Sequence, residues 1–491
     1  MPGINLLSNY QAALPEIILL AVAIFVILVD LFTTSKRVLA ILSLIGLLAT
    51  IVYSGILWGT LAQGAFNRMM AADNFAWFFD ILLAGTAFLV ILTTADYAKK
   101  FERFQGEYYA LILLATTGMM FMASATDLIT VYIATELTSI SLYVLVSFLK
   151  DNKSTEAALK YLLLGAIASA VMLYGMAMVF GFTGQTQLGP IANTLMNMKL
   201  SSLASSPALL LGIAMLIAGF GFKIAAVPFQ MWVPDVYEGA PTPVTAYLSV
   251  ASKAAGFAVV LRLFFSAFGL SFTTDWGMIF SVLAVITMII GNVTAIPQSN
   301  IKRMLGYSSI AQAGYLMVGL ATLGYAPSNS VAGQSGVIFF LAAYALTNIG
   351  AFTAIIAITN ATNSDEIGDF AGMGKRAPLT ALALTFCLIS LIGIPPAAGF
   401  MAKFYLFRAA VLNNLLWLVV IAVINSVISA FYYLRVVKVM WFNEPAVTEK
   451  VPASIAPRVG LFICSLGVLA LGIIPGYIMR LAEIAGKLIR F

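Results

Sequence analysis

The chain has 491 residues, of which 62% are hydrophobic and only 9% are charged. Since a soluble domain carries about 25% charged residues, this composition excludes a soluble globular protein and predicts an integral membrane protein. The net charge of +6 is read as a sign of membrane topology, not of nucleic-acid binding. Histidine is absent, and the two cysteines, Cys387 and Cys464, lie in apolar runs, so we expect no metal or redox cofactor in this chain.

About fourteen apolar runs approach the roughly 20 residues that a membrane-spanning helix needs. No basic residue precedes the first run, so we expect a retained helix there and no cleavable signal peptide. Short polar loops separate the runs, and the predicted fold class is an all-α polytopic membrane protein. In chain order the runs lie near residues 14–34, 38–60, 75–95, 107–124, 127–149, 157–182, 206–231, 241–268, 276–297, 304–325, 334–359, 377–409, 412–440 and 458–478.

Basic residues gather in the loops that follow odd-numbered runs. The positive-inside rule therefore predicts that these loops are cytoplasmic and that both termini lie outside. The loop after run 7 departs from this pattern, because it carries Asp235 and Glu238 without a base. The C-terminal tail, with Arg480, Lys487 and Arg490, is expected to lie on the membrane surface as an amphipathic helix. The loop bases are Lys36, Arg37, Lys99, Lys100, Arg103, Lys150, Lys153, Lys302, Arg303, Lys375, Arg376, Arg435, Lys438, Lys450 and Arg458.

Several ionisable residues remain inside the runs, where a charge costs roughly 2.5–3.5 kcal/mol. Arg262 and Arg408 lie near run ends, so snorkelling to the surface is favoured for both, and it is an alternative for Lys160. The others lie deeper and predict an ion path through the protein, with a static salt bridge as the alternative. The deeper residues are Glu136, Lys223, Lys253 and Lys403.

Two of the deep lysines lie near prolines that interrupt a run. Pro228 follows Lys223 by five residues, and Lys403 follows Pro396 by seven, after the stretch GIPPAAGF. Proline breaks a helix, and a broken helix in a bilayer must be buried in protein or line a cavity. Because runs 7 and 12 are five apart, we predict two inverted five-helix repeats with broken helices 7 and 12.

The breaks would let water reach the lysines. Desolvation disfavours a charged amine and a nearby carboxylate such as Glu136 favours it, so a lysine between these influences can exchange protons. The predicted chemistry is therefore a proton relay. Hydroxyl groups that would hold a water chain are those of Thr138, Ser139, Ser141, Ser308, Ser309 and Tyr315. The predicted division of the chain is 1–106, with helices 1–3; 107–269 and 270–440, the two repeats; and 441–491, with helix 14 and the tail.

Four segments carry a resemblance to a known family. They are MWVPDVYEGAPTPVTAYLSVASKAAGFAVVLRL (231–263), NIKRMLGYSSIAQAGYLMVGL (300–320), FFLAAYALTNIGAF (339–352) and GIPPAAGFMAKFYLF (393–407). With them the chain resembles subunit N of the proton-pumping NADH-quinone oxidoreductases, respiratory complex I. The resemblance implies an antiporter-like subunit of fourteen helices in a bacterial inner membrane. It also implies that NADH, FMN, iron–sulfur clusters and quinone bind to other subunits.

The resemblance also assigns roles to individual residues. Glu136 matches a helix-5 glutamate that pairs with the lysine of broken helix 7, here Lys223. Lys253 matches the helix-8 lysine of a central polar axis, and Lys403 matches an exit-side lysine of helix 12. Lys160 matches a helix-6 lysine. The implied partners are the antiporter-like subunit M, the small subunits K, J and A, and membrane lipids, with no nucleic acid.

Two positions depart from the family pattern. Gln230 stands where histidine is expected, and Gln312 stands where it is frequent, so proton transfer here would depend on lysines and water. The closest rival function is a cation/proton antiporter subunit of the Mrp type or an ion-pumping hydrogenase subunit. A purely structural scaffold is a third alternative, and the costly charges at membrane depth argue against it.

Overall fold

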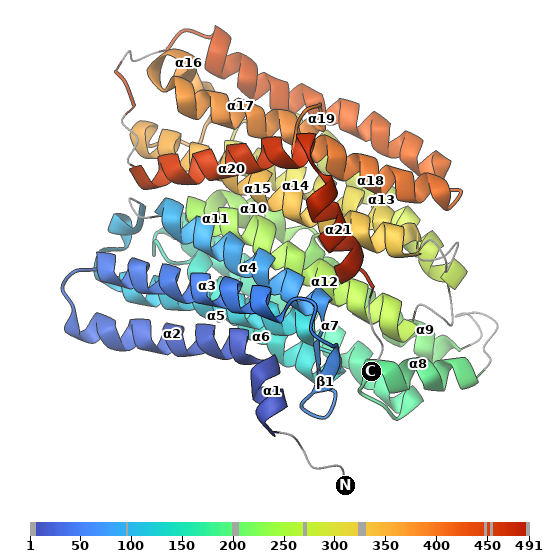
Figure 1. Cartoon of the computed structure of the whole chain (residues 1–491). Helices are drawn as coiled ribbons and strands as arrows, with labels where there is room; N and C mark the ends of the chain where they lie inside the picture. Colours follow the sequence, from blue (N-terminus) through green and yellow to red (C-terminus); the bar gives the residue numbers. More distant parts are fainter. Residues whose placement is uncertain are drawn as a thin grey trace.

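The structure, a computed structural model, describes residues 6–94, 97–198, 206–268, 273–322, 330–445, 449–451 and 455–487. Long helices run side by side through the molecule (Figure 1). Within the described ranges, eleven helical stretches are long and apolar enough to cross a membrane. They are α2 (Leu14–Phe32), α3 (Arg37–Leu57), α4 (Asn74–Thr94), α6 (Leu128–Val146), α7 (Asn152–Thr183), α9 (Pro207–Ile224), the stretch Thr242–Phe268, α13 (Thr273–Ala295), α15 (Ser330–Thr362), α19 (Leu416–Phe442) and α20 (Ile455–Ile473).

The remaining predicted runs also form helices. The runs near 107–124 and 304–325 correspond to α5 (Gln105–Ser124) and α14 (Ile301–Ala321), and run 12 is divided between α17 (Pro378–Ile392) and α18 (Ala398–Leu412). These four helices are not among the eleven, so the count of fourteen spans stays a prediction. The all-helical membrane fold is confirmed.

Both predicted helix breaks are present. α9 ends at Ile224 and is capped by Ala225, whose φ of 62° is left-handed. Pro228 lies between it and the next helix, α10 (Trp232–Gly239). α17 ends at Gly393 with a φ of 94°, and α18 begins only after Pro396. A left-handed residue followed by proline is a common way to end a helix. The predicted helices 7 and 12 are therefore both interrupted. The first break lies between α9 and α10, and the second lies between α17 and α18.

The stretch Thr242–Phe268 lies at the centre of the bundle and is wholly buried. It consists of α11 (Thr242–Tyr247), a π-helical turn η3 (Leu248–Ser252), α12 (Lys253–Leu263) and a second π-helical turn η4 (Phe264–Phe268). By contrast, only 28% of the apolar window of α2 and 33% of that of α7 is buried. A helix buried on every side can carry polar groups shielded from lipid, and this one carries Lys253 and Arg262.

Details of the first predicted repeat recur in the second. Asp127 caps α6 and bridges to Gln187, and Asn300 caps α14 and bridges to Glu366. Leu128 N donates to Thr186 O, and Ile301 N donates to Asp365 O. Arg262 Nε donates to Ala123 O, and Arg435 Nη1 donates to Ile296 O. These parallels support the predicted repeats, whose inversion and boundaries stay predictions.

Several short elements were not predicted, because the loops were expected to be simple connections. They are α1 (Leu6–Ala12), the hairpin β1 (Gln63–Ala65) and β2 (Met70–Ala72), η1 (Tyr97–Phe104), α8 (Leu188–Asn197), η7 (Ile367–Phe370) and α16 (Met373–Arg376). In the tail, α21 (Gly476–Ala485) is helical as predicted and packs on α4 and α15 (Figure 1). Its position at a membrane surface is not tested, and Arg490 lies outside the described residues.

Candidate functional site: buried lysines and their hydroxyl partners

Lys223 lies in the last turn of α9, immediately before the break, and is buried. Its Nζ donates a hydrogen bond to Ser139 Oγ of α6. Glu136 lies one turn earlier on α6, where it is half-buried and accepts a hydrogen bond from Ser169 of α7. Ser139 therefore lies between Lys223 and Glu136. The resemblance implied a direct ion pair between these two residues, and the described part of the chain does not form it.

Lys253 begins α12, directly after the π-helical turn η3, and only 1% of it is exposed. Its Nζ donates to the backbone carbonyl of Ser309 and, at 2.5 Å, to Ser309 Oγ. The same hydroxyl lies 2.9 Å from Tyr344 OH and 3.2 Å from Tyr237 OH. Single π-helical turns inside α-helices are frequent at functional sites, and this one sets Lys253 in a group of buried hydroxyls.

Lys403 is held by the helix break that precedes it. The break leaves the last carbonyl groups of α17 without helical partners, and Lys403 Nζ donates to Leu391 O at 3.2 Å and Ile392 O at 2.8 Å. It also donates to Ser426 Oγ at 2.9 Å and lies 4.3 Å from the centre of the Tyr315 ring. The prolines and glycines of this stretch thus interrupt the helix and free the carbonyl groups of Leu391 and Ile392 to accept hydrogen bonds from the lysine.

A small cavity of about 10 Å³ lies between Lys403 and the partners of Lys253. Gln312, Tyr344, Ser390 and Lys403 are among the residues that line it. Gln312 Nε2 donates to Leu391 O, the carbonyl oxygen that Lys403 also contacts. A space of this size is at the lower limit for one water molecule. The arrangement therefore brings the surroundings of two lysines together at a single water-sized gap.

The other hydroxyl groups proposed from sequence divide into two sets. The hydroxyl groups of Ser139 and Ser309 and the ring of Tyr315 contact the deep lysines, and the predicted water chain stays a prediction. Ser308 lies within hydrogen-bond distance of Tyr433 OH, whereas Thr138 and Ser141 donate to carbonyl groups of their own helix. Gln230 is only partly buried, so it is Gln312 that lies among the lysines.

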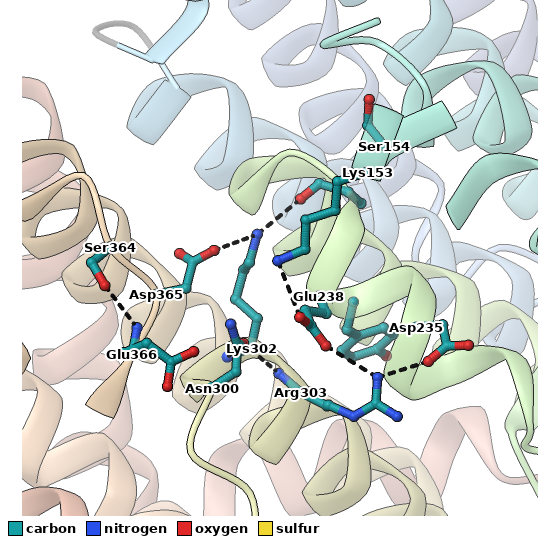
Figure 2. A network of polar contacts seen from close by, with 12 residues as sticks. Lys153, Ser154, Asp235, Glu238, Asn300, Lys302, Arg303, Ser364, Asp365 and Glu366 are labelled. Carbon is teal, nitrogen blue, oxygen red and sulfur yellow. Dashed lines mark hydrogen bonds and ion pairs between the residues drawn. The ribbon is translucent and has the colours of Figure 1, made fainter. Parts of the chain in front are cut away.

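Lys160 is not part of this buried row. Its side chain is 44% exposed and forms ion pairs with Glu156 at 2.8 Å and with Asp235 of α10 at 2.9 Å. Figure 2 shows the adjoining network, in which Arg303 contacts Asp235 and Glu238 at 2.7 and 3.1 Å. Lys153 pairs with Glu238 and Lys302 pairs with Asp365. The acids of α10 thus neutralise bases of neighbouring elements, which explains the loop that departed from the basic pattern.

This network affects the protonation of Asp235, which lies outside the membrane-spanning segments. Burial by itself would raise the pKa of this carboxyl group, but hydrogen bonds from Lys160 and Arg303 outweigh burial and hold the pKa below its usual value. Asp235 is therefore a fixed negative charge at neutral pH and holds two elements, α7 and α14, against α10.

The prediction that Arg262 snorkels to the membrane surface is wrong. Its side chain is 1% exposed and forms a bidentate ion pair with Asp73, with both distances at 2.9 Å. Arg408 is exposed, and its snorkelling to the membrane surface stays a prediction. Sequence analysis also missed Glu16 and Asp80, which are buried in α2 and α4. Their position inside apolar runs is the sequence signal that marks both carboxylates.

Metal binding finds no support within the described ranges, where no group of three or more His, Cys, Asp or Glu residues is placed to hold an ion. Cys387 and Cys464 are both buried and free.

Comparison with known proteins is consistent with this geometry. Residues 125–429 match the family model described as NADH:quinone oxidoreductase/Mrp antiporter, TM. The chain is 50% identical to NADH-quinone oxidoreductase subunit N of Dehalococcoides mccartyi, over 97% of this chain and 99% of that protein.

Solved structures show the same fold. A chain of respiratory complex I from Thermus thermophilus with bound aureothin is 30% identical, with a TM-score of 0.80, over 96% of this chain and 99% of that chain. A chain of the Mrp complex from Dietzia sp. DQ12-45-1b shares the fold with a TM-score of 0.81 at 20% identity, over 98% and 97% of the two chains. The length and identity of the sequence match show that this chain belongs to the NADH-quinone oxidoreductase subunit N family.

Proposed function

We propose that this chain conducts protons across the membrane as a subunit of an NADH-quinone oxidoreductase, driven by quinone reduction in other subunits. The observation that carries the proposal is the water-sized cavity shared by Tyr344 and Lys403. It brings two lysines that are far apart in sequence to the ends of one hydrogen-bonded route.

The first part of the route lies at α9. Lys223 donates to Ser139, and Glu136 lies one turn away on the same helix. A negative charge near a buried lysine favours its protonated form. In this proposal Glu136 therefore sets how readily Lys223 takes up a proton, and Ser169, which donates to Glu136, holds the carboxylate in place.

α12 then passes close to α9. A Cβ atom added at Gly256 would lie 3.5 Å from Lys223 Cβ, and Lys253 lies one turn earlier on α12. Glycine at the crossing allows this approach. The backbone packing thus brings the helices that carry Lys223 and Lys253 into contact, with the lysines held by different hydroxyl partners.

From Lys253 the contacts are continuous as far as the cavity. Lys253 Nζ donates to Ser309 Oγ, whose oxygen lies 2.9 Å from Tyr344 OH, and Tyr344 and Lys403 both line the cavity. One water in the cavity would complete the route, because hydroxyl groups and water each donate and accept hydrogen bonds.

Lys403 also borders a second space. An apolar groove of about 730 Å³ is lined by Lys403, Ser426, Phe404 and Arg408 among others. Lys403 therefore separates the small inner cavity from an open groove on the outside of this chain. In the proposal Lys403 passes the proton to Ser426 Oγ, the hydroxyl group that it contacts and that lines the groove.

The resemblance and the relatives' names support the setting of this function. We propose that subunits M, K, J and A are neighbours in the membrane arm of the complex. NADH, FMN, the iron–sulfur clusters and quinone would bind elsewhere in the complex. The proposed location is a bacterial inner membrane, with both termini outside.

Tyr344→Phe tests the route, because it removes one hydroxyl oxygen and keeps the ring. Proton translocation per NADH oxidised should fall several-fold in vesicles that contain the assembled complex. Tyr174→Phe is the matched control, since Tyr174 is 60% exposed on α7. Equal translocation by the two variants would contradict the route through Tyr344.

The fold shared with the Mrp complex keeps one rival function open to experiment. Affinity purification of this chain from its native membrane distinguishes the oxidoreductase function from the antiporter function. NADH-oxidising subunits should co-elute with it, and a set of antiporter subunits without them would favour the rival.

A further inference from the structure

A group of buried charged side chains lies in the N-terminal helices, outside the row of lysines. Glu16 of α2 is 1% exposed, Asp80 of α4 is 0% exposed, and Asp73, just before α4, is 3% exposed. Arg262 of α12 is the cation that lies among them, at 1%. Asp80 interacts electrostatically with Glu16, Asp73 and Arg262, so three carboxyl groups lie near a single guanidinium group in a part of the bundle closed to solvent.

Asp73 occupies the charged face of this guanidinium group. Arg262 Nη1 and Nη2 donate to the two oxygens of Asp73 at 2.9 Å each, and Nε donates to Ala123 O at 2.8 Å. The Phe75 ring centre lies 4.7 Å from the guanidinium carbon. A bidentate pair of this kind compensates one negative charge, so it leaves Glu16 and Asp80 without a cation of their own.

Glu16 and Asp80 also have carboxyl oxygens without hydrogen-bond partners among the described residues. Asp80 Oδ2 accepts one long hydrogen bond, 3.4 Å, from Ser54. Glu16 Oε2 and Asp80 Oδ1 are buried and have no hydrogen-bond partner among the described residues. Trp77 Nε1, one turn before Asp80 on α4, is also buried and unpartnered there. Neither carboxyl group has an ion pair within the described ranges.

The other charged groups on these elements pair with each other, lie at the opposite helix end or are exposed. Asp30 and Lys36 form a mutual ion pair at 2.5 Å at the opposite end of α2 and α3. Glu107 lies in the first turn of α5, whereas Ala123 is near its last. Arg68, in the turn of the hairpin, is exposed. Ionising Glu16 or Asp80 would therefore place a bare charge in a medium of low dielectric constant, which is strongly unfavourable.

We propose that Glu16 and Asp80 form a second proton-holding site, in which both side chains are neutral carboxylic acids at rest. The protons are carried on Glu16 Oε2 and Asp80 Oδ1, the oxygens that accept no hydrogen bond. A protonated oxygen becomes a hydrogen-bond donor. Glu16 and Asp80 precede residue 125, where the family match begins. The proposal does not depend on whether the lysine row conducts protons.

α12 connects this site to the lysine row. Lys253 begins the helix and Arg262 lies in its last turn. A proton leaving the site would add a negative charge near the Asp73–Arg262 pair, at one end of the helix that carries the central lysine. The site thus holds protons beside the row and not within it.

Infrared difference spectroscopy of the intact complex in H₂O and D₂O tests the proposal. A protonated carboxyl group absorbs above the amide bands, and its band shifts on deuteration. Glu16→Gln and Asp80→Asn should each remove one such band, and each should assemble, because the amide has the shape of the neutral acid. Asp30→Asn is the matched control on α2 and should remove none.

Conservative exchanges cover the case in which an amide variant fails to assemble. Glu16→Asp and Asp80→Glu keep the carboxyl group and should shift one deuterium-sensitive band each. If these bands are missing from the unmodified complex, or persist unchanged in the variants, Glu16 and Asp80 are ionised and the proposal is wrong.

Discussion

Asp235 and Lys403 lie at the same distance along the chain after the two helix breaks. Each lies ten residues after the left-handed residue that ends the preceding segment, Ala225 in the first and Gly393 in the second. The charges are opposite and so are the surroundings. Asp235 forms ion pairs with Lys160 and Arg303, whereas Lys403 is buried against freed backbone carbonyls. One position thus holds helices together, and the other presents an amine to a cavity.

Asp235→Asn should make the stability of the assembled protein less sensitive to acid pH. The pKa of Asp235 is held low, so its ion pairs add stability above the ordinary carboxyl pKa of about 4, and this stability is lost as the pH falls through the lowered value. Thermal unfolding of the purified complex from neutral to acid pH would measure this. A variant with the unaltered pH profile would show that the network contributes no stability.

Arg262→Met should destabilise the fold, because Asp73 would remain as a buried charge without its partner. Breaking a buried pair in this way costs about 3–5 kcal/mol. The double variant Arg262→Met with Asp73→Asn should recover most of the loss, since it leaves no charge unpaired. Yield and melting temperature of the complex report both effects, and a single variant as stable as the unmodified protein would contradict a fixed pair.

Ser139→Ala removes the hydroxyl group that accepts from Lys223. A hydrogen bond to a charged group contributes about 1.5–3 kcal/mol, so Lys223 should lose its fixed position and proton translocation should fall. Ser139→Thr should restore much of it. Ser147→Ala is the control at the end of the same helix, where the hydroxyl bonds only to the backbone. Full translocation by Ser139→Ala would show that the Ser139 hydroxyl group is not needed for proton transfer.

Glu136→Gln keeps the shape of the side chain and removes its charge. If the carboxylate favours the protonated form of Lys223, translocation driven by NADH oxidation should drop while the complex still assembles. Ser169→Ala should have a smaller effect in the same direction, because it removes only a donor to Glu136. Translocation equal to that of the unmodified complex would reduce Glu136 to a packing role.

Much of the fold follows from local signals. Apolar length predicts the helices, and Pro228 and Pro396 predict the two breaks, since proline affects the residues beside it whatever the tertiary structure. The buried positions of Lys223, Lys253 and Lys403 follow from their place deep in apolar runs.

The partners of these residues could not be predicted in the same way. Asp73 and Arg262 are far apart in the chain, and only helix packing brings them together. The sequence alone therefore favours a surface position for an arginine near a run end. Lys403 contacts backbone carbonyls, which every residue has and which no sequence pattern marks. Glu136 and Lys223 were expected to touch, but the side chain of Ser139 lies closer to the lysine.

The central claim is that Lys403 carries protons between the inner cavity and the outer groove. Lys403→Met removes the amine at nearly constant volume. It leaves Ile392 O without this partner, at a cost of about 1–3 kcal/mol, so assembly should be confirmed first. The decisive measurement is the number of protons translocated per NADH oxidised by the reconstituted complex. The account predicts a clearly lower ratio than for the unmodified complex, and an equal ratio would contradict it.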